Sequence, residues 1–217
     1  MKKPFANNRI EYIINLIRPK KSDKVLNIGV SNIPDLEIAL EDNVKECITV
    51  DIDEKKIKKA KNFLKKTKLI KLDITKPNNL KNNYYDSIIM LEVLEHIKED
   101  RKVLLKINNL LKKKGKLLLA VPNNSFLHIF NPVKYTQHER HYSNDQIKNL
   151  LKETGFKIIH FNLVECWTLL ANLYIHLILK FIFRKNTQFG LLKNKANSTY
   201  RQSNNSGMDI IILAEKI

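Results

Sequence analysis

Short apolar runs alternate with segments of helical periodicity along most of the chain, and this alternation limits the possible folds more than any other feature. Strands that alternate with helices form a parallel sheet with helices on both faces. The first three expected strands each end at a glycine or an aspartate: Val25–Ile28 before Gly29, Cys47–Val50 before Asp51 and Leu69–Leu72 before Asp73. The sequence therefore predicts an α/β fold.

The remaining segments extend the same pattern. Helices are expected at 8–17, 33–41, 53–65, 99–112 and 144–154, the last two closed by Gly115 and Gly155. Further strands are expected at Tyr85–Leu91, Lys116–Val121, Phe156–Phe161 and Met208–Ala214. Ligands of such sheets bind at the carboxyl ends of the strands, so the chemistry is expected there.

Length and charge restrict the class of protein further. A chain of 217 residues suits a single domain spanning 1–217. Its 39 basic and 22 acidic residues give a formal charge of +17. A Lys- and Asn-rich composition can reflect codon bias, so this charge permits but does not indicate an anionic partner such as RNA, phospholipid or a phosphorylated substrate. Cys47 and Cys166 are far apart and are expected to be reduced core thiols of a cytosolic protein. No apolar run follows the basic start, so no secretory signal is expected.

An apolar segment followed by a basic one is inserted before the last expected strand, at about 163–206. Polar residues in Leu163–Phe183 recur three or four positions apart, which predicts a helix with one narrow polar stripe. Two interpretations stand side by side: a lid packed over the substrate pocket, or a helix lying on a membrane surface through 163–185. Both favour a lipophilic or bulky substrate. The stretch 184–206 is expected to be a loop.

The acids at the strand ends indicate the kind of ligand. Asp51 follows Gly29 by 22 residues and ends the second expected strand, where a carboxylate can accept hydrogen bonds from ribose hydroxyls. Asp73 ends the third expected strand, within reach of an adenine. Together these residues point to a ligand that contains adenosine.

The sequence resembles the class I S-adenosylmethionine-dependent methyltransferases, and among them the quinone-biosynthesis O-methyltransferases. The resemblance rests on the order of short segments, namely 25–29, 50–53, 72–74, 85–96, 110–119, 121–123, 141–143 and 153–156. It implies a Rossmann-like, seven-stranded, mostly parallel sheet with an antiparallel last strand. It also implies S-adenosylmethionine as cofactor, bound by Gly29, Ser31, Asp51, Ile52, Asp73, Ile74, Leu91 and Glu92.

The glycine loop departs from the family pattern Gly-x-Gly-x-Gly. Ser31 and Ile33 occupy the second and third glycine positions, and Asn27 replaces the acid that usually precedes the first. Ile33 is β-branched and takes a positive φ only at a high energetic cost. The sequence therefore predicts either weaker cofactor binding or another loop path, and a cofactor-free relative that serves as a binding or scaffold protein is one alternative.

Two carboxylates and an imidazole follow the fourth expected strand. Glu92 and Glu95 are three residues apart, so at the start of a helix they would share a face with His96 close by. Such a set can hold Mg²⁺ or another divalent cation that activates a substrate hydroxyl. The resemblance also covers small-RNA 2′-O-methyltransferases, which show a similar pattern. In the metal-free alternative, Glu92 lines the cofactor pocket and His96 acts as a general base.

Two further histidines, His138 and His141, follow the fifth expected strand. We expect them to contact substrate beside Arg140, although Ser143 and its neighbours could simply cap the next helix. Deprotonation of the acceptor is thus assigned to His96, His138 or His141.

The predicted function is O-methylation of a small or lipid-linked metabolite by a cytoplasmic protein, with a peripheral site at the inner membrane face as an open option. RNA 2′-O-methylation is the alternative supported by the charge. No Asn-Pro-Pro-Tyr or Asp-Pro-Pro-Tyr motif follows the fourth expected strand, which disfavours methylation of base amines.

Overall fold

The computed structural model describes residues 8–124, 140–164 and 207–217. The strands are β1 (Lys24–Ile28), β2 (Glu46–Asp51), β3 (Lys68–Lys71), β4 (Tyr85–Leu91), β5 (Leu111–Pro122), β6 (Phe156–Val164) and β7 (Asp209–Lys216). The helices are α1 (Asn8–Ile17), α2 (Asp35–Leu40), α3 (Glu54–Lys61), α4 (Asp100–Leu110) and α6 (Asn144–Glu153), with a 3-10 turn η1 at Leu94–His96.

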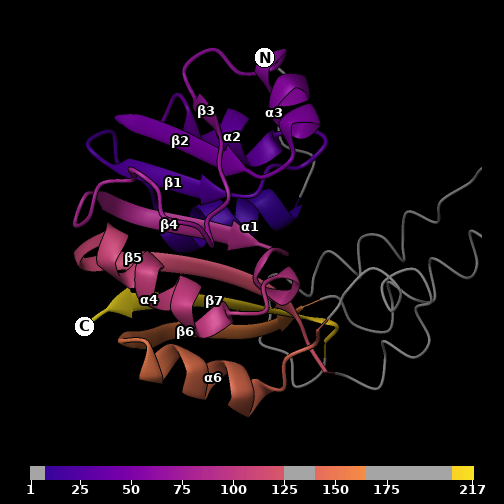
Figure 1. Cartoon of the computed structure of the whole chain (residues 1–217), viewed down its shortest axis with the longest axis vertical. Coiled ribbons are helices and arrows are strands. Elements are labelled where there is room, and N and C mark those ends of the chain that lie inside the picture. The colour runs from indigo at the N-terminus through magenta and orange to yellow at the C-terminus, as the bar shows by residue number, and fades with distance from the viewer. Residues whose placement is uncertain (1–7, 125–139, 165–206) are drawn as a thin grey trace, which may run out of the picture.

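The strands form one seven-stranded sheet in the order β3-β2-β1-β4-β5-β7-β6, which Figure 1 shows from edge to edge. Strand β7 runs antiparallel to its neighbours β5 and β6, whereas the other pairings are parallel. The predicted Rossmann-like sheet with an antiparallel last strand is thus confirmed. The order reverses between the adjacent strands β1 and β4, and ligands bind at the carboxyl ends of strands beside such a reversal.

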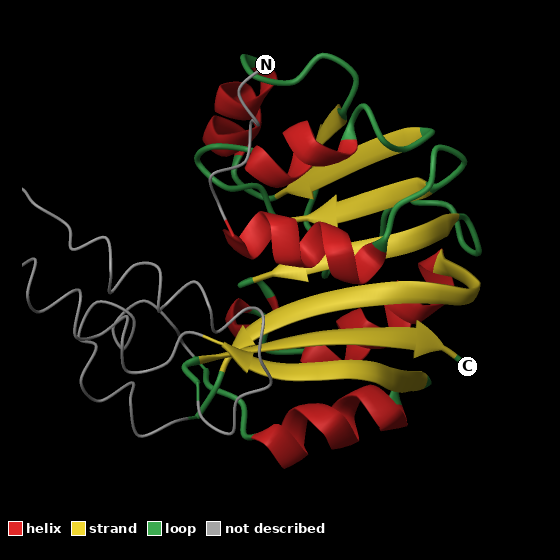
Figure 2. Ribbon diagram, turned by 180° about the vertical axis from the view of Figure 1, so that it is seen from behind, coloured by secondary structure: helices red, strands yellow, loops and turns green. Residues whose placement is uncertain are grey.

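Helices cover both faces of the sheet, as Figures 1 and 2 show from opposite sides. On one face, Ile13 of α1 and Leu40 of α2 are buried in one apolar cluster against β1 and β4. On the other face, Ile107 of α4 and Leu151 of α6 are buried in a larger cluster. Each fully buried Ile or Leu side chain contributes about 1.5–3 kcal/mol of transfer free energy, so the apolar stripes of these helices fix where they dock.

Three predicted boundaries were wrong. Helix α4 ends at Leu110, because Leu111 is buried in extended conformation and already pairs with Tyr85 of β4, so Gly115 lies inside β5 and closes no helix. Helix α3 ends at Lys61 and not at residue 65. The chain beyond it is held by the Glu41 carboxylate, which accepts hydrogen bonds from the backbone N–H groups of residues 65–67.

The third wrong boundary lies at β6, which continues to Val164. Leu163 and Val164 are both buried and pair with Ile210 and Asp209 of β7, so the expected apolar helix does not begin at 163. The rest of that helix and the expected loop lie in 165–206, outside the described residues. None of the helices in the described part of the chain is long and apolar enough to cross a membrane.

Candidate active site

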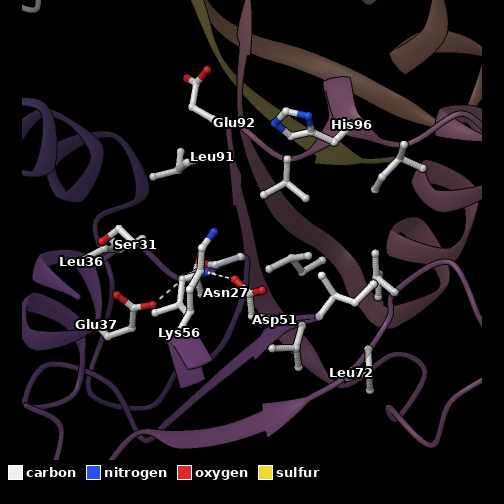
Figure 3. A pocket seen from close by; sticks show the side chains of 18 of the residues that line it. Asn27, Ser31, Leu36, Glu37, Asp51, Lys56, Leu72, Leu91, Glu92 and His96 are labelled. Carbon is white, nitrogen blue, oxygen red and sulfur yellow. Dashed lines mark hydrogen bonds between the residues drawn. The ribbon is translucent and has the colours of Figure 1, made fainter. Parts of the chain in front are cut away.

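A cavity of about 760 Å³ opens where β1, β2, β3 and β4 end, and Figure 3 shows its wall from close by. This volume lies within the range of small-molecule and cofactor sites in proteins. The eight residues predicted to bind the cofactor all line it: Gly29, Ser31, Asp51, Ile52, Asp73, Ile74, Leu91 and Glu92. The sheet topology therefore brings these separate segments of the sequence to one place.

The turn after β1 requires one glycine. Gly29 has a φ of +91°, and its N–H donates to the carbonyl of Val50 at 2.8 Å. A Cβ at this position would lie 2.5 Å from Cγ2 of Val93, so a side chain has no room. Neither Ser31 nor Ile33 is among the described residues with positive φ, and this removes the backbone objection to Ile33.

Asp51 holds the base of the cavity together. It is only 8% exposed, and its two carboxylate oxygens accept from the N–H groups of Val30 at 2.8 Å and Asp53 at 2.7 Å. Because each carboxylate oxygen offers two acceptor sites, both oxygens keep capacity for a ligand hydroxyl. Asp51 therefore orders the loop and remains suited to bind a ribose.

An apolar surface and a further carboxylate lie beyond Asp51. Ile52 is 66% exposed although it lines the cavity, so a flat ring placed there would cover apolar surface that now faces water. The Asp73 carboxylate accepts hydrogen bonds from the hydroxyl and the N–H of Thr75. Both hydrogen bonds lower the pKa of Asp73, and the one from the hydroxyl has the larger effect. Asp73 is thus an ionised acceptor at the cavity rim.

The wall at the end of β4 carries an ion pair. Glu92 has a φ of +52°, which costs a non-glycine residue about 1–2 kcal/mol. Its carboxylate pairs with the guanidinium of Arg9 from α1, and Arg9 also lies 3.9 Å from the Asp209 carboxylate. Arg9 and Glu92 both line the cavity, so the first helix closes the end that the resemblance assigns to the methionine part of the cofactor.

The predicted metal site is not supported. No group of three or more His, Cys, Asp or Glu side chains within 8–124, 140–164 and 207–217 is arranged to hold a metal ion. Glu92 and Glu95 do not share a helical face, because the chain is extended up to Leu91 and η1 begins only at Leu94. Glu95 is buried away from the cavity lining, and this burial raises its pKa to about 8. A carboxyl that favours its protonated form is a poor ligand for a divalent cation.

His96 is the predicted catalytic histidine that the structure places at the cavity. It lines the wall beside Val93, and its side chain is 45% exposed. His141 does not line the cavity, and His138 lies outside the described residues. Arg140 does not line the cavity either: it pairs with Asp100 at 2.5 Å, and Tyr142 donates to the same carboxylate at 2.9 Å.

The comparisons with known proteins agree with this geometry. A family model described as a methyltransferase domain matches residues 5–161. This chain belongs to the methyltransferase-domain family. It is a class I methyltransferase of the S-adenosylmethionine-dependent type, and its sheet order and cavity fit that family. No curated protein sequence matches it.

Several solved structures share the fold of this methyltransferase. An S-adenosylmethionine-dependent methyltransferase from Mesorhizobium loti is 12% identical with a TM-score of 0.63, over 94% of this chain and 96% of that one. A candidate methyltransferase from Bacillus halodurans is 14% identical with a TM-score of 0.68, over 97% and 99%. The YcgJ protein of Bacillus subtilis is 14% identical with a TM-score of 0.65, over 95% and 97%. At these identities the likeness extends to the fold alone.

Arg9 and Glu37 are among the charged wall residues of the methyltransferase that were missed from the sequence. Arg9 directly precedes the apolar stripe of α1, and a charged residue at the start of a helix does not by itself indicate a site. Glu37 offered a clearer sign, because it stands between Leu36 and Leu40 on the apolar stripe of α2. A charged residue at a core position is either paired or functional, and that rule could have identified it.

Proposed function

We propose that this methyltransferase methylates a hydroxyl group of a small or lipid-linked metabolite. The observation that supports this proposal best is the place of His96, a partly exposed imidazole on the cavity wall at the end of β4. An imidazole can act as a general base near neutral pH, and a hydroxyl must lose its proton when it is methylated. The segment Met90–Val93 offers no proline-rich amide motif for an exocyclic amine.

The residues present fit S-adenosylmethionine. Gly29 leaves space that a side chain would fill, Asp51 keeps acceptor capacity, and Ile52 offers an exposed apolar surface. When bound, the cofactor supplies an electrophilic methyl group on a sulfonium. The acceptor oxygen would form the new bond to carbon as the carbon–sulfur bond breaks, and a ring nitrogen of His96 would take the proton. Holding both reactants in one cavity supplies much of the rate enhancement.

A three-part experiment tests this proposal. Titration calorimetry with S-adenosylhomocysteine should show micromolar binding, and no binding at millimolar ligand would refute the cofactor assignment. Transfer of a labelled methyl group is then measured on hydroxylated lipids, on soluble phenols and on RNA 3′ ends. Replacement H96N should lower kcat about 10²-fold or more and leave S-adenosylhomocysteine affinity unchanged. An unchanged kcat in H96N would exclude His96 as the base.

RNA is retained as a second candidate acceptor because of the charge of +17. It predicts that transfer to RNA falls steeply between about 50 and 200 mM salt, since phosphate contacts release counterions. Transfer to a lipid or phenol that is insensitive to salt, with none to RNA, would exclude this candidate.

A further inference from the structure

The buried carboxylate of Glu37 is a feature of the cavity wall that the family pattern does not account for. Glu37 is 1% exposed, and its Oε1 accepts from Nδ2 of Asn27 at 2.7 Å and from the hydroxyl of Thr49 at 3.3 Å. Both donors are neutral. Figure 3 shows Glu37 and Asn27 joined by a hydrogen bond within the set of residues that line the cavity.

The charges around Glu37 do not compensate its own. No salt bridge to Glu37 occurs within the described residues, and the like charge of Asp35 acts on its carboxylate unfavourably. By contrast, another carboxylate of the cavity wall, Glu92, is already paired with Arg9. Burial raises the pKa of the Glu37 carboxyl. A buried carboxylate without a cation is expensive, so a cationic ligand group placed beside it would relieve that cost.

The position of Asn27 explains why a carboxylate would be needed from α2. Asn27 stands two residues before Gly29, where the glycine-loop pattern of the family it resembles has an acid, and its amide donates to the carbonyl of Gly29 at 2.7 Å. An amide cannot neutralise an ammonium group. Glu37 accepts from the same amide nitrogen, so a negative charge lies one hydrogen bond away from position 27.

We propose that Glu37, positioned by Asn27, binds the α-ammonium group of the methionine part of the cofactor. This inference rests on the proposed use of S-adenosylmethionine and adds a binding residue to it. Glu37 is a binding residue and takes no part in the methyl transfer. The pair Asn27–Glu37 thus does the work of a single acid at position 27.

The test compares two ligands on four proteins by titration calorimetry. One ligand is S-adenosylhomocysteine, and the other is its deaminated analogue, which keeps the carboxylate and lacks the ammonium. The unmodified protein should prefer S-adenosylhomocysteine by roughly tenfold to a hundredfold, the usual range for a hydrogen bond between charged groups. In E37Q this preference should fall to within about threefold, while affinity for the analogue stays the same.

Two further variants separate binding from folding. The double variant N27D/E37Q moves the carboxylate to position 27 and should restore the preference. The variant D42N removes an exposed carboxylate just beyond α2 that does not line the cavity, and it should keep the full preference. Thermal melting of each variant shows whether it is folded.

Each outcome decides one question. Equal binding of the two ligands by the unmodified protein overturns the proposal without any variant. A preference that survives in folded E37Q also overturns it and makes Glu37 a structural acceptor for Asn27 and Thr49. Failure of the unmodified protein to bind S-adenosylhomocysteine at all refutes the cofactor assignment, and the role of Glu37 falls with it.

Discussion

Replacement of Gly29 with alanine tests the geometry of the cavity floor most directly. The φ of +91° costs an alanine about 1–2 kcal/mol. The new Cβ would lie 2.5 Å from Cγ2 of Val93, and relief of such overpacking typically costs about 1–3 kcal/mol. Adding the two terms, G29A should lower the free energy of unfolding by about 2–5 kcal/mol.

The two terms can be separated with a second variant. V93A removes the group that the new Cβ meets, so in the V93A background G29A should cost only the conformational term of about 1–2 kcal/mol. The difference between the two backgrounds, about 1–3 kcal/mol, is the coupling energy of the cycle. Urea denaturation of the four proteins, with linear extrapolation to water, measures it.

Gly155 offers a matched control away from the cavity. Its φ is +83°, and a Cβ there would meet Nδ2 of Asn108 at 3.0 Å. G155A should therefore destabilise the fold with no change in affinity for S-adenosylhomocysteine, whereas G29A should weaken that affinity as well. A G29A protein within about 0.5 kcal/mol of the unmodified one, or an equal cost of G29A in both Val93 backgrounds, would refute the geometry.

Three more variants have defined outcomes. I33G should destabilise the protein by about 0.5–1 kcal/mol, because glycine loses more backbone entropy on folding. It should leave the affinity for S-adenosylhomocysteine within about twofold, because Ile33 needs no positive φ. A large gain in affinity would show that Ile33 impairs the loop. S143A should cost about 1 kcal/mol in urea denaturation, since Ser143 and Gln146 form a capping box at the start of α6; no loss would contradict it. Burial lowers the pKa of His160, so below about pH 6.5 the unfolded chain binds more protons than the folded one, and the free energy of unfolding should fall as the pH drops. In H160Q this fall should be smaller. An identical pH profile of stability in H160Q would exclude His160 as its source.

The strand ends could be predicted because two features of the sequence mark each of them. A mostly apolar run of four residues marks each strand, and the glycine or aspartate that follows marks its carboxyl end. Strands β1 and β2 are largely buried, whereas β3 at the edge of the sheet is only partly buried. Gly29, Asp51 and Asp73 therefore located three segments of the cavity wall from sequence alone. Parallel pairing then brings those segments together without further information.

The contacts of α1 with the cavity wall and the sheet could not be predicted, because they join distant residues. Arg9 and Glu92 are 83 positions apart, and neither has a local pattern that indicates the other. The same applies to Tyr12 of α1, which hydrogen-bonds with His160 of β6 at 2.7 Å. These pairs dock α1 on the sheet, and they follow from where the helix packs and not from its periodicity.

The glycine loop shows why a motif has to be judged by what each position does. Three glycines suggest three positions with the same requirement, and on that basis Ile33 predicts weaker cofactor binding or another loop path. In the structure only the first position combines a positive φ with a close neighbour, Val93, so only Gly29 is obligatory for the backbone. Ile33 is 56% exposed at the rim, where a β-branched side chain costs little. The substitution that departs most from the family pattern is therefore Asn27, because it changes the charge facing the ligand and not the path of the chain.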